Sequence, residues 1–192
     1  MNALVLDASR ESDTRNQAAA DTLAKEFDAR GHRVERLSLR DLDIRACTGC
    51  FGCWTQTPGE CVIADDARHI AEQVVNSGVT AMVSPVTFGG YSSLAKSVLD
   101  RMICLVLPTF TMLNAEVHHN PRYEHYPIWL ALGTQPEPSA EEAALFARVV
   151  ERNAVNLHNP SHAVEVVVGG QSAEAAVERL LASAGLWTEA LA

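Results

Sequence analysis

The feature that most restricts the fold of this chain is a regular alternation of short apolar runs with longer amphipathic segments. The apolar runs are too short for helices and end at turn residues, which is typical of strands buried on both faces of a sheet. In the longer segments, apolar residues recur every three or four positions, as on the inner face of a helix. The predicted strands are 3–7, 34–39, 79–84, 128–132 and 164–168, and the predicted helices are about 14–30, 66–76, 93–102, 139–157 and 172–184.

Alternating strands and helices predict an α/β fold with a parallel sheet and helices on both of its faces. Right-handed crossovers leave few topologies for five strands, and they favour the flavodoxin-like order 2-1-3-4-5. The chain has 192 residues and no repeat or linker, so we expect a single domain over residues 1–192. Within it we predict a cysteine loop at 47–61 and an irregular insert at 103–127.

Composition narrows the classes of partner. The formal net charge is -9 and the sequence has no basic stripe, which argues against nucleic acid and against an anionic membrane surface. The apolar run 103–107 stops at Pro108 and is too short to span a bilayer. The first residues lack the charged and apolar regions of a signal peptide. We therefore expect a cytoplasmic protein that does not bind membranes.

Four of the five cysteines form one run with the spacing C-x2-C-x2-C-x7-C, at Cys47, Cys50, Cys53 and Cys61. Four thiolates this close together can surround one inorganic centre, and four cysteines are the usual ligands of a [4Fe–4S] cluster. Structural zinc is an alternative, although its sites usually show two separated C-x2-C pairs. Free thiols, or a disulfide formed on handling, are the third interpretation, and a cytosolic setting disfavours a native disulfide.

Ligands of an open parallel sheet bind at the carboxyl ends of its strands. Here these ends are the loops after residues 7, 39, 84 and 132, so the cysteine loop is expected at the same edge as the other three. The first loop brings hydroxyls and an arginine to a helix N-terminus, which suits either a phosphate monoester or a plain capped turn. Its candidate residues are Ser9, Arg10, Ser12 and Thr14. No GxGxxG or Walker A motif is present, which disfavours a dinucleotide fold and a nucleotide hydrolase.

These residues resemble the flavodoxin-like NAD(P)H-dependent FMN reductases, and within them the iron–sulfur flavoproteins. The stretch from Ser84 to Arg101 is similar to the flavin-ring loop of that family and to the Leu-x-Lys and Asp-Arg signature that follows it. The run 47–61, followed by two aspartates, is similar to the cluster motif of the iron–sulfur flavoproteins. One departure is the first loop, where Asp7 stands in place of the glycine of the family's Gly-Ser-x-Arg. Another is Thr87, which replaces an aromatic residue.

The resemblance implies that FMN is the flavin, with its phosphate at Ser9, Arg10, Ser12 and Thr14. Its ring would lie against Pro85, Val86, Thr87, Phe88, Gly89, Gly133 and Thr134. The resemblance also implies a [4Fe–4S] cluster on Cys47, Cys50, Cys53 and Cys61, near the flavin. No catalytic acid or base is expected, because hydride transfer to the flavin requires none. The Asp100-Arg101 pair is interpreted as an ordinary surface ion pair and Cys104 as a buried apolar residue.

We expect an FMN-dependent oxidoreductase or electron-transfer flavoprotein. It would take electrons from NAD(P)H or ferredoxin and pass them to a small-molecule acceptor. The alternatives are an NAD(P)H-dependent FMN or quinone reductase without a cluster, and a flavodoxin-like electron carrier without catalytic activity. The insert 103–127 is expected to form the contact of a homodimer or higher homo-oligomer. Its histidines His118, His119 and His125 fit that contact or a lid better than a metal site.

Overall fold

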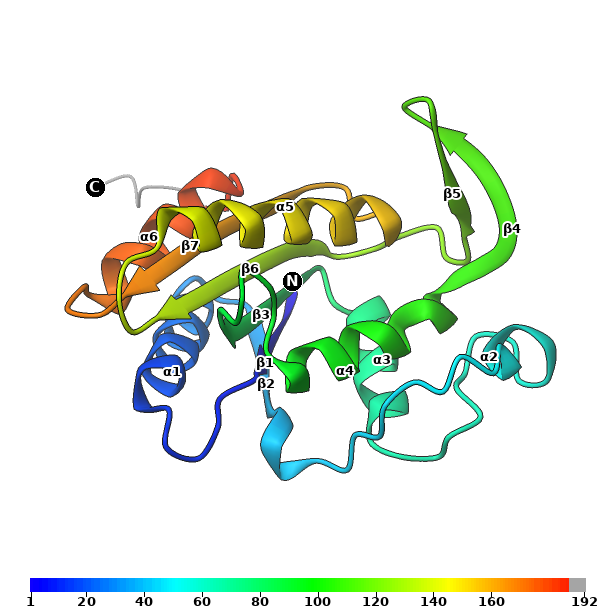
Figure 1. Cartoon of the computed structure of the whole chain (residues 1–192), viewed down its shortest axis with the longest axis horizontal. Coiled ribbons are helices and arrows are strands. Elements are labelled where there is room, and N and C mark those ends of the chain that lie inside the picture. The colour runs from blue at the N-terminus through cyan, green and yellow to red at the C-terminus, as the bar shows by residue number, and fades with distance from the viewer. Residues whose placement is uncertain (187–192) are drawn as a thin grey trace.

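The structure is a computed structural model that describes residues 1–186. Its centre is a sheet of five parallel strands in the order β2-β1-β3-β6-β7 (Figure 1). When strands outside this sheet are not counted, the order is 2-1-3-4-5, and the predicted fold class is confirmed. The strands of the sheet are β1 (Asn2–Asp7), β2 (Arg33–Ser38), β3 (Val79–Pro85), β6 (Ile128–Gln135) and β7 (His162–Val168).

Helices cover both faces of the sheet, as the sequence predicts. The first strand shows why, because successive side chains of a strand point to opposite faces. Ala3 and Val5 join the buried cluster on one face, whereas Leu4 and Leu6 join the cluster on the other. Helices α1 (Thr14–Ala29) and α6 (Ala173–Ser183) cover the first face, and α3 (Ala67–Asn76), α4 (Ser93–Arg101) and α5 (Ala140–Asn156) cover the second.

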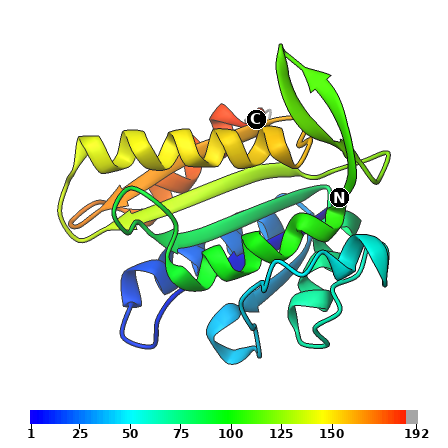
Figure 2. The same ribbon diagram turned by 45° about the vertical axis from the view of Figure 1, so that its right-hand side comes forward.

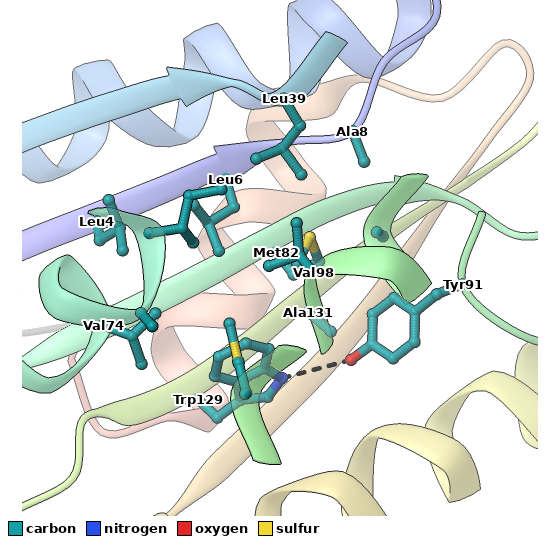
Figure 3. Packing of buried hydrophobic residues seen from close by; sticks show 14 of the residues in the cluster. Leu4, Leu6, Ala8, Leu39, Val74, Met82, Tyr91, Val98, Trp129 and Ala131 are labelled. Atoms are coloured by element: carbon teal, nitrogen blue, oxygen red, sulfur yellow. Dashed lines mark hydrogen bonds between the residues drawn. The ribbon is translucent and has the colours of Figure 1, made fainter. Parts of the chain in front are cut away.

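The larger cluster is built around Trp129, which is fully buried on β6 (Figure 3). Its indole Nε1 donates a hydrogen bond of 3.3 Å to the Tyr91 hydroxyl, so the polar atom of each ring has a partner. The ring of Phe146 on α5 meets Tyr91 edge-on, with 5.0 Å between the ring centroids. These three side chains connect the sheet to α5 and to the loop that precedes α4.

The segment predicted to be irregular, 103–127, contains a hairpin. A short 3-10 helix, η2 (Met102–Leu105), leads into the antiparallel strands β4 (Val106–Leu113) and β5 (Glu116–Pro121). Figures 1 and 2 show this hairpin extending away from the sheet. Asn114 and Ala115 form its turn with φ of 51° and 64°, the left-handed conformation that matches the twist of two paired strands. Because the turn lacks the usual Asn-Gly signal and Pro108 interrupts the first strand, the pattern hides the hairpin.

Three further differences concern the loops. Strand β6 continues to Gln135, so Gly133 and Thr134 lie inside the sheet and not in the loop predicted for them. A 3-10 helix, η1 (Leu39–Asp41), follows β2, and a short helix, α2 (Gly52–Thr55), forms inside the cysteine loop. The prediction of one domain over 1–192 stays a prediction, and its last residues, 187–192, lie outside the described part. Among residues 1–186, no helix has the length and apolar character needed to cross a membrane.

Two neighbouring residues of α5 should contribute very differently to the free energy of unfolding. Phe146 is fully buried, whereas the side chain of Leu145 is about half exposed to solvent. Phe146→Ala should lower the free energy of unfolding by about 3–5 kcal/mol, because it leaves a cavity in the core. Leu145→Ala should change it by no more than about 0.5 kcal/mol. Urea unfolding followed by circular dichroism measures both, and equal losses would contradict this assignment of the core.

Candidate functional site

Three loops meet at the carboxyl edge of the sheet, because the strands they follow are neighbours. Strand β3 lies between β1 and β6, with Asp7 paired to Val83 and Pro85 paired to Thr134. Figure 2 shows the loops after these three strands at the same end of the sheet. This is the edge at which open parallel sheets bind ligands.

The first loop separates its polar residues into an inner and an outer set. Ser9 is buried; its backbone N–H donates to Asp7 Oδ1 at 2.9 Å, and its hydroxyl also bonds to that carboxylate. The hydroxyl of Ser9 is therefore already engaged inside the protein. Arg10, Ser12 and Thr14 are exposed, and they lie around the start of α1. Asp13 caps the helix by accepting from the Asn16 amide at 3.0 Å. The hydroxyl and guanidinium groups, together with the amides that Asp13 leaves free, form the open part of a candidate anion site.

Asn16 connects the three strands and was not singled out from the sequence. Its Nδ2 lies 3.2 Å from Asp7 Oδ1, 2.8 Å from Ser9 Oγ and 3.2 Å from the Val83 carbonyl oxygen. Its Oδ1 accepts a hydrogen bond of 3.1 Å from the hydroxyl of Thr134. The signal for it is a polar residue at a position of α1 that faces the sheet, and its partners become clear only once the strands are assembled.

Asp7 holds a negative charge at the end of β1, where the resembling family usually has glycine. The carboxylate is buried and pairs with Arg36 Nη2 on β2 at 2.7 Å. A buried charge is tolerated when it is paired and hydrogen-bonded, and Ser9 and Asn16 supply the remaining donors. The aspartate thus fixes the shape of the first loop from within.

The second loop makes a tight turn over residues 87–90. The backbone N–H of Thr87 donates to the Gly90 carbonyl, and that of Gly90 to the Thr87 carbonyl, both at 2.9 Å. Phe88 and Gly89 have φ of 50° and 73°. A side chain at Gly89 would lie 2.7 Å from Leu145 Cβ, so both the conformation and the close packing require glycine here. Phe88 is 94% exposed at the tip of the turn.

The remaining predicted ring contacts lie deeper. The Val86 N–H donates to the Thr134 carbonyl at 2.9 Å, so these two residues connect the second loop to β6. A Cβ on Gly133 would lie 2.8 Å from Val86 Cγ2 and 2.9 Å from Phe146 Cε1. Gly133 therefore allows the second loop and α5 to approach the strand, and Thr134 is buried against Asn16.

The cysteine loop does not lie at this edge, and the prediction that it shares the edge with the other loops is wrong. After η1 the chain runs back beside α4, and α2 packs near η2 at the other end of that helix (Figure 1). The indole Nε1 of Trp54 donates to the Val106 carbonyl at 2.9 Å and fixes α2 there. The nine residues of α4 therefore separate the second loop from the cysteines by about 13 Å along the helix axis.

The four cysteines nevertheless line one cavity of about 230 Å³ beside the C-terminal end of α4. Cys53 is buried, Cys61 is half-buried, and Cys47 and Cys50 are exposed. A hydrogen bond from the Gly52 backbone N–H lowers the pKa of Cys50, whereas burial raises the pKa of Cys53. Within residues 1–186, no three His, Cys, Asp or Glu side chains are arranged to hold a single metal ion.

The loop turns sharply at the cysteines because of two residues. Phe51 adopts the left-handed conformation with φ of 55° and begins α2. A Cβ on Gly52 would lie 2.5 Å from Val62 Cγ1, so only glycine allows the two arms of the loop to approach. Phe51 also lines the cavity, and its ring stacks on that of Trp54 with centroids 5.3 Å apart. The Trp54 ring in turn lies 4.8 Å from the ring of His119 on β5.

Arg101 holds the loop in place, and its interpretation as a surface residue is wrong. Its guanidinium is almost fully buried, and Nη1 and Nη2 each donate to one carboxylate oxygen of Asp65 at 2.8 Å. The same two nitrogens donate to the carbonyls of Arg45, at 2.8 Å, and Ile63, at 3.1 Å. Asp100, the neighbour in sequence, pairs with Lys96 instead. The prediction that Cys104 is a buried apolar residue is correct, since that side chain is 2% exposed.

The ion pair shifts the pKa of both partners. Burial alone would raise the pKa of Asp65, but the hydrogen bonds from Arg101 and from the Arg45 backbone outweigh it, and the pKa lies below its ordinary value. Burial alone would lower the pKa of Arg101, but Asp65 and the neighbouring Cys61 raise it. Both groups are therefore charged at neutral pH.

This shift predicts a pH dependence of stability. A carboxyl whose pKa is lowered on folding contributes stability above its unfolded pKa of about 3.9, and that contribution disappears as the pH falls toward the folded pKa. The difference in free energy of unfolding between the natural chain and Asp65→Asn should therefore shrink below about pH 4. Urea unfolding between pH 7 and pH 3 measures it, with Asp100→Asn as the exposed control. A difference that stays constant with pH would contradict the assignment.

Known protein families and curated proteins match part of this sequence. The profile of the NADPH-dependent FMN reductases matches residues 1–121. An iron–sulfur flavoprotein of Archaeoglobus fulgidus is 32% identical over 83 residues, which cover 43% of this chain and 37% of that protein. An iron–sulfur flavoprotein of Methanocaldococcus jannaschii is 35% identical over 71 residues, covering 37% of this chain and 36% of that protein. The matches thus span less than half the length of these relatives.

Solved structures share the fold. An FMN-dependent NADH-azoreductase from Bacillus anthracis in complex with FMN superposes with a TM-score of 0.67 at 13% identity, over 96% of this chain and 98% of that one. An NAD(P)H:quinone oxidoreductase from Methanothermobacter marburgensis gives 0.65 at 12% identity, over 96% and 97%. At such identities the likeness concerns the fold alone. The family follows from the sequence match over residues 1–121: the chain belongs to the NADPH-dependent FMN reductase family.

Proposed function

We propose that this chain is an FMN-dependent oxidoreductase that binds one FMN per chain at the carboxyl edge of its sheet. The observation that carries the proposal is the buried network around Asn16, which fixes the ends of three neighbouring strands in a family of FMN reductases. The first loop offers charge and donors for a single phosphate, which favours FMN over a dinucleotide. The flavin supplies the electron chemistry when it is bound, and the protein positions it and adjusts its potential.

In this proposal the residues of the first loop have two roles. Arg10, Ser12 and Thr14 hold the phosphate with the amides at the start of α1, because they are exposed around the helix N-terminus. Ser9 keeps the loop in shape, since its hydroxyl is engaged with Asp7 and Asn16.

The second loop would meet the edge of the flavin ring. Pro85, Val86, Thr87 and Gly89 place their backbone there, and Gly133 and Thr134 support them from β6. Phe88 has no cover within the described chain, and a ring or partner that packs on it would exclude water from this side of the site.

The residues of the cysteine loop fit a [4Fe–4S] cluster held by Cys47, Cys50, Cys53 and Cys61. Their donor set is sulfur only, all four line one cavity, and the buried cation of Arg101 lies beside them to offset the charge of four thiolates. Such a cluster would store and pass single electrons. The flavin edge lies at the far end of α4, so the two centres are not adjacent in one chain.

A reductase of the same family without a cluster is the second candidate. The arrangement of the described residues favours it in one respect, because no three ligand side chains are already placed around a single metal ion. NAD(P)H is the electron donor that the family description supports, and ferredoxin remains a proposal. Slow or absent bleaching of the flavin by NADPH would favour an electron carrier instead.

We also propose that the hairpin forms the contact of a homodimer. Phe110 and Met112 on β4 and Val117 on β5 are each about two-thirds exposed. Met112 is paired with Val117 across the hairpin, so these side chains belong to one face of the ribbon. An apolar face of this kind is typical of an interface between subunits.

The phosphate assignment predicts that Ser12→Ala/Thr14→Ala weakens FMN binding. Each substitution removes a hydrogen bond to a charged acceptor, worth about 1.5–3 kcal/mol, so the dissociation constant should rise at least about tenfold. Fluorescence titration of the apoprotein with FMN measures it. Ser97→Ala, which removes a partly exposed hydroxyl on α4, is the matched control. Unchanged affinity in the double variant would place the phosphate elsewhere.

The cluster assignment predicts that, after anaerobic reconstitution, each chain binds the iron and sulfide of one [4Fe–4S] cluster in addition to one FMN. Cys50→Ser should lose most of the iron, because it removes one of four thiolate ligands. Cys104→Ala is the control, since that thiol does not line the cavity and should retain the iron. Iron, sulfide and flavin analyses decide the matter. Near-zero iron in the natural chain with FMN fully bound would leave the reductase without a cluster.

A further inference from the structure

One donor of Arg101 has no partner of normal geometry among residues 1–186, although the Cys61 thiol lies beside the guanidinium. A guanidinium carries five N–H groups, and the four on Nη1 and Nη2 are used by Asp65 and by the carbonyls of Arg45 and Ile63. The fifth, on Nε, is buried and makes no hydrogen bond of normal geometry. Buried N–H groups are rarely left without a partner, so each one that is requires an explanation.

The position of Arg101 shows where a partner would lie. Its side chain lines the cavity of the four cysteines, and Cys61 is the thiol whose charge acts on the guanidinium. The bidentate pairing with Asp65 prevents the guanidinium from turning, because it fixes both Nη atoms at once. The guanidinium is therefore held in one place beside Cys61, and a sulfur at that position can accept the hydrogen of Nε.

We propose that the Nε–H of Arg101 donates a hydrogen bond to a sulfur atom of the group held by Cys47, Cys50, Cys53 and Cys61, and that Arg101 thereby sets its reduction potential. This inference rests on the [4Fe–4S] cluster of the proposed function. Hydrogen bonds to the sulfurs and the net charge nearby are two determinants of the potential of such a group. Both a donor and a positive charge stabilise the more negative, reduced form, so Arg101 raises the potential.

A second arginine, Arg68 on α3, serves as the matched control. Arg68 donates from Nε to the Cys61 carbonyl at 2.7 Å, and its Nη2 lies 3.3 Å from the Val62 carbonyl. It also pairs with Glu60 at 2.7 Å. Arg68 thus binds the backbone of Cys61, and the Nε of Arg68 already has a partner. Replacing either arginine by lysine keeps the charge, but only at Arg101 does it remove the donor beside the sulfur.

The experiment compares Arg101→Lys and Arg68→Lys after anaerobic reconstitution with iron and sulfide. Iron content and the midpoint potential, by spectropotentiometric titration, are measured in both. Arg101→Lys should lower the midpoint potential by at least about 59 mV, which is a tenfold decrease in the equilibrium constant for one-electron reduction. Arg68→Lys should leave it unchanged. An unchanged potential in iron-loaded Arg101→Lys would overturn the inference while leaving the cluster in place.

Asp65→Glu keeps the test decisive if Arg101→Lys fails to retain iron. It keeps both charges, but its longer side chain displaces the guanidinium that Asp65 holds in place, so the Nε–H moves away from the sulfur and the potential should fall. An unchanged potential in this variant would overturn the inference. If the natural chain itself takes up no iron, the cluster of the proposed function fails first, and the inference fails with it.

Discussion

The buried ion pair between Arg101 and Asp65 is the interaction on which the position of the cysteines depends. The segment between β2 and α3 contains only η1 and the single turn of α2, so it has little regular structure of its own to hold it. Arg101, which is fixed at the end of α4, holds the segment in place by binding one of its side chains and two of its backbone carbonyls. Removing one partner of such a buried pair leaves an uncompensated charge, which costs about 3–5 kcal/mol.

The carboxyl edge depends on a different principle. There the chain uses a neutral amide, Asn16, which reaches three strands because an amide both donates and accepts. The two sites are therefore built independently: one rests on a buried charge pair and the other on a hydrogen-bond network around a paired aspartate. Among residues 1–186, each site keeps a buried side-chain atom without a partner: Nε of Arg101 beside the cysteines and Oε1 of Gln135 at the end of β6.

The periodicity of the sequence was sufficient to predict the parallel sheet, its strand order and the helices on both faces, because burial on two faces leaves a continuous apolar run in each strand. The same reasoning missed the hairpin, whose turn at Asn114 and Ala115 uses left-handed residues without the usual glycine. It also misplaced the cysteine loop. A loop that starts at the carboxyl end of a strand need not stay there, and its path is fixed here by tertiary hydrogen bonds from Arg101, which leave no trace in local sequence patterns.

Helix α4 begins at the second loop and ends at the cysteines, and this fixes its length. One added residue would move Arg101 by only about 1.5 Å along the axis, but it would rotate the side chain by about 100° around the helix. The guanidinium would then point away from Asp65 and the cavity. Insertions that lengthen the hairpin turn carry no such penalty, because Asn114 and Ala115 are exposed at its tip. The hairpin turn can therefore take up added residues without moving Arg101, whereas α4 cannot.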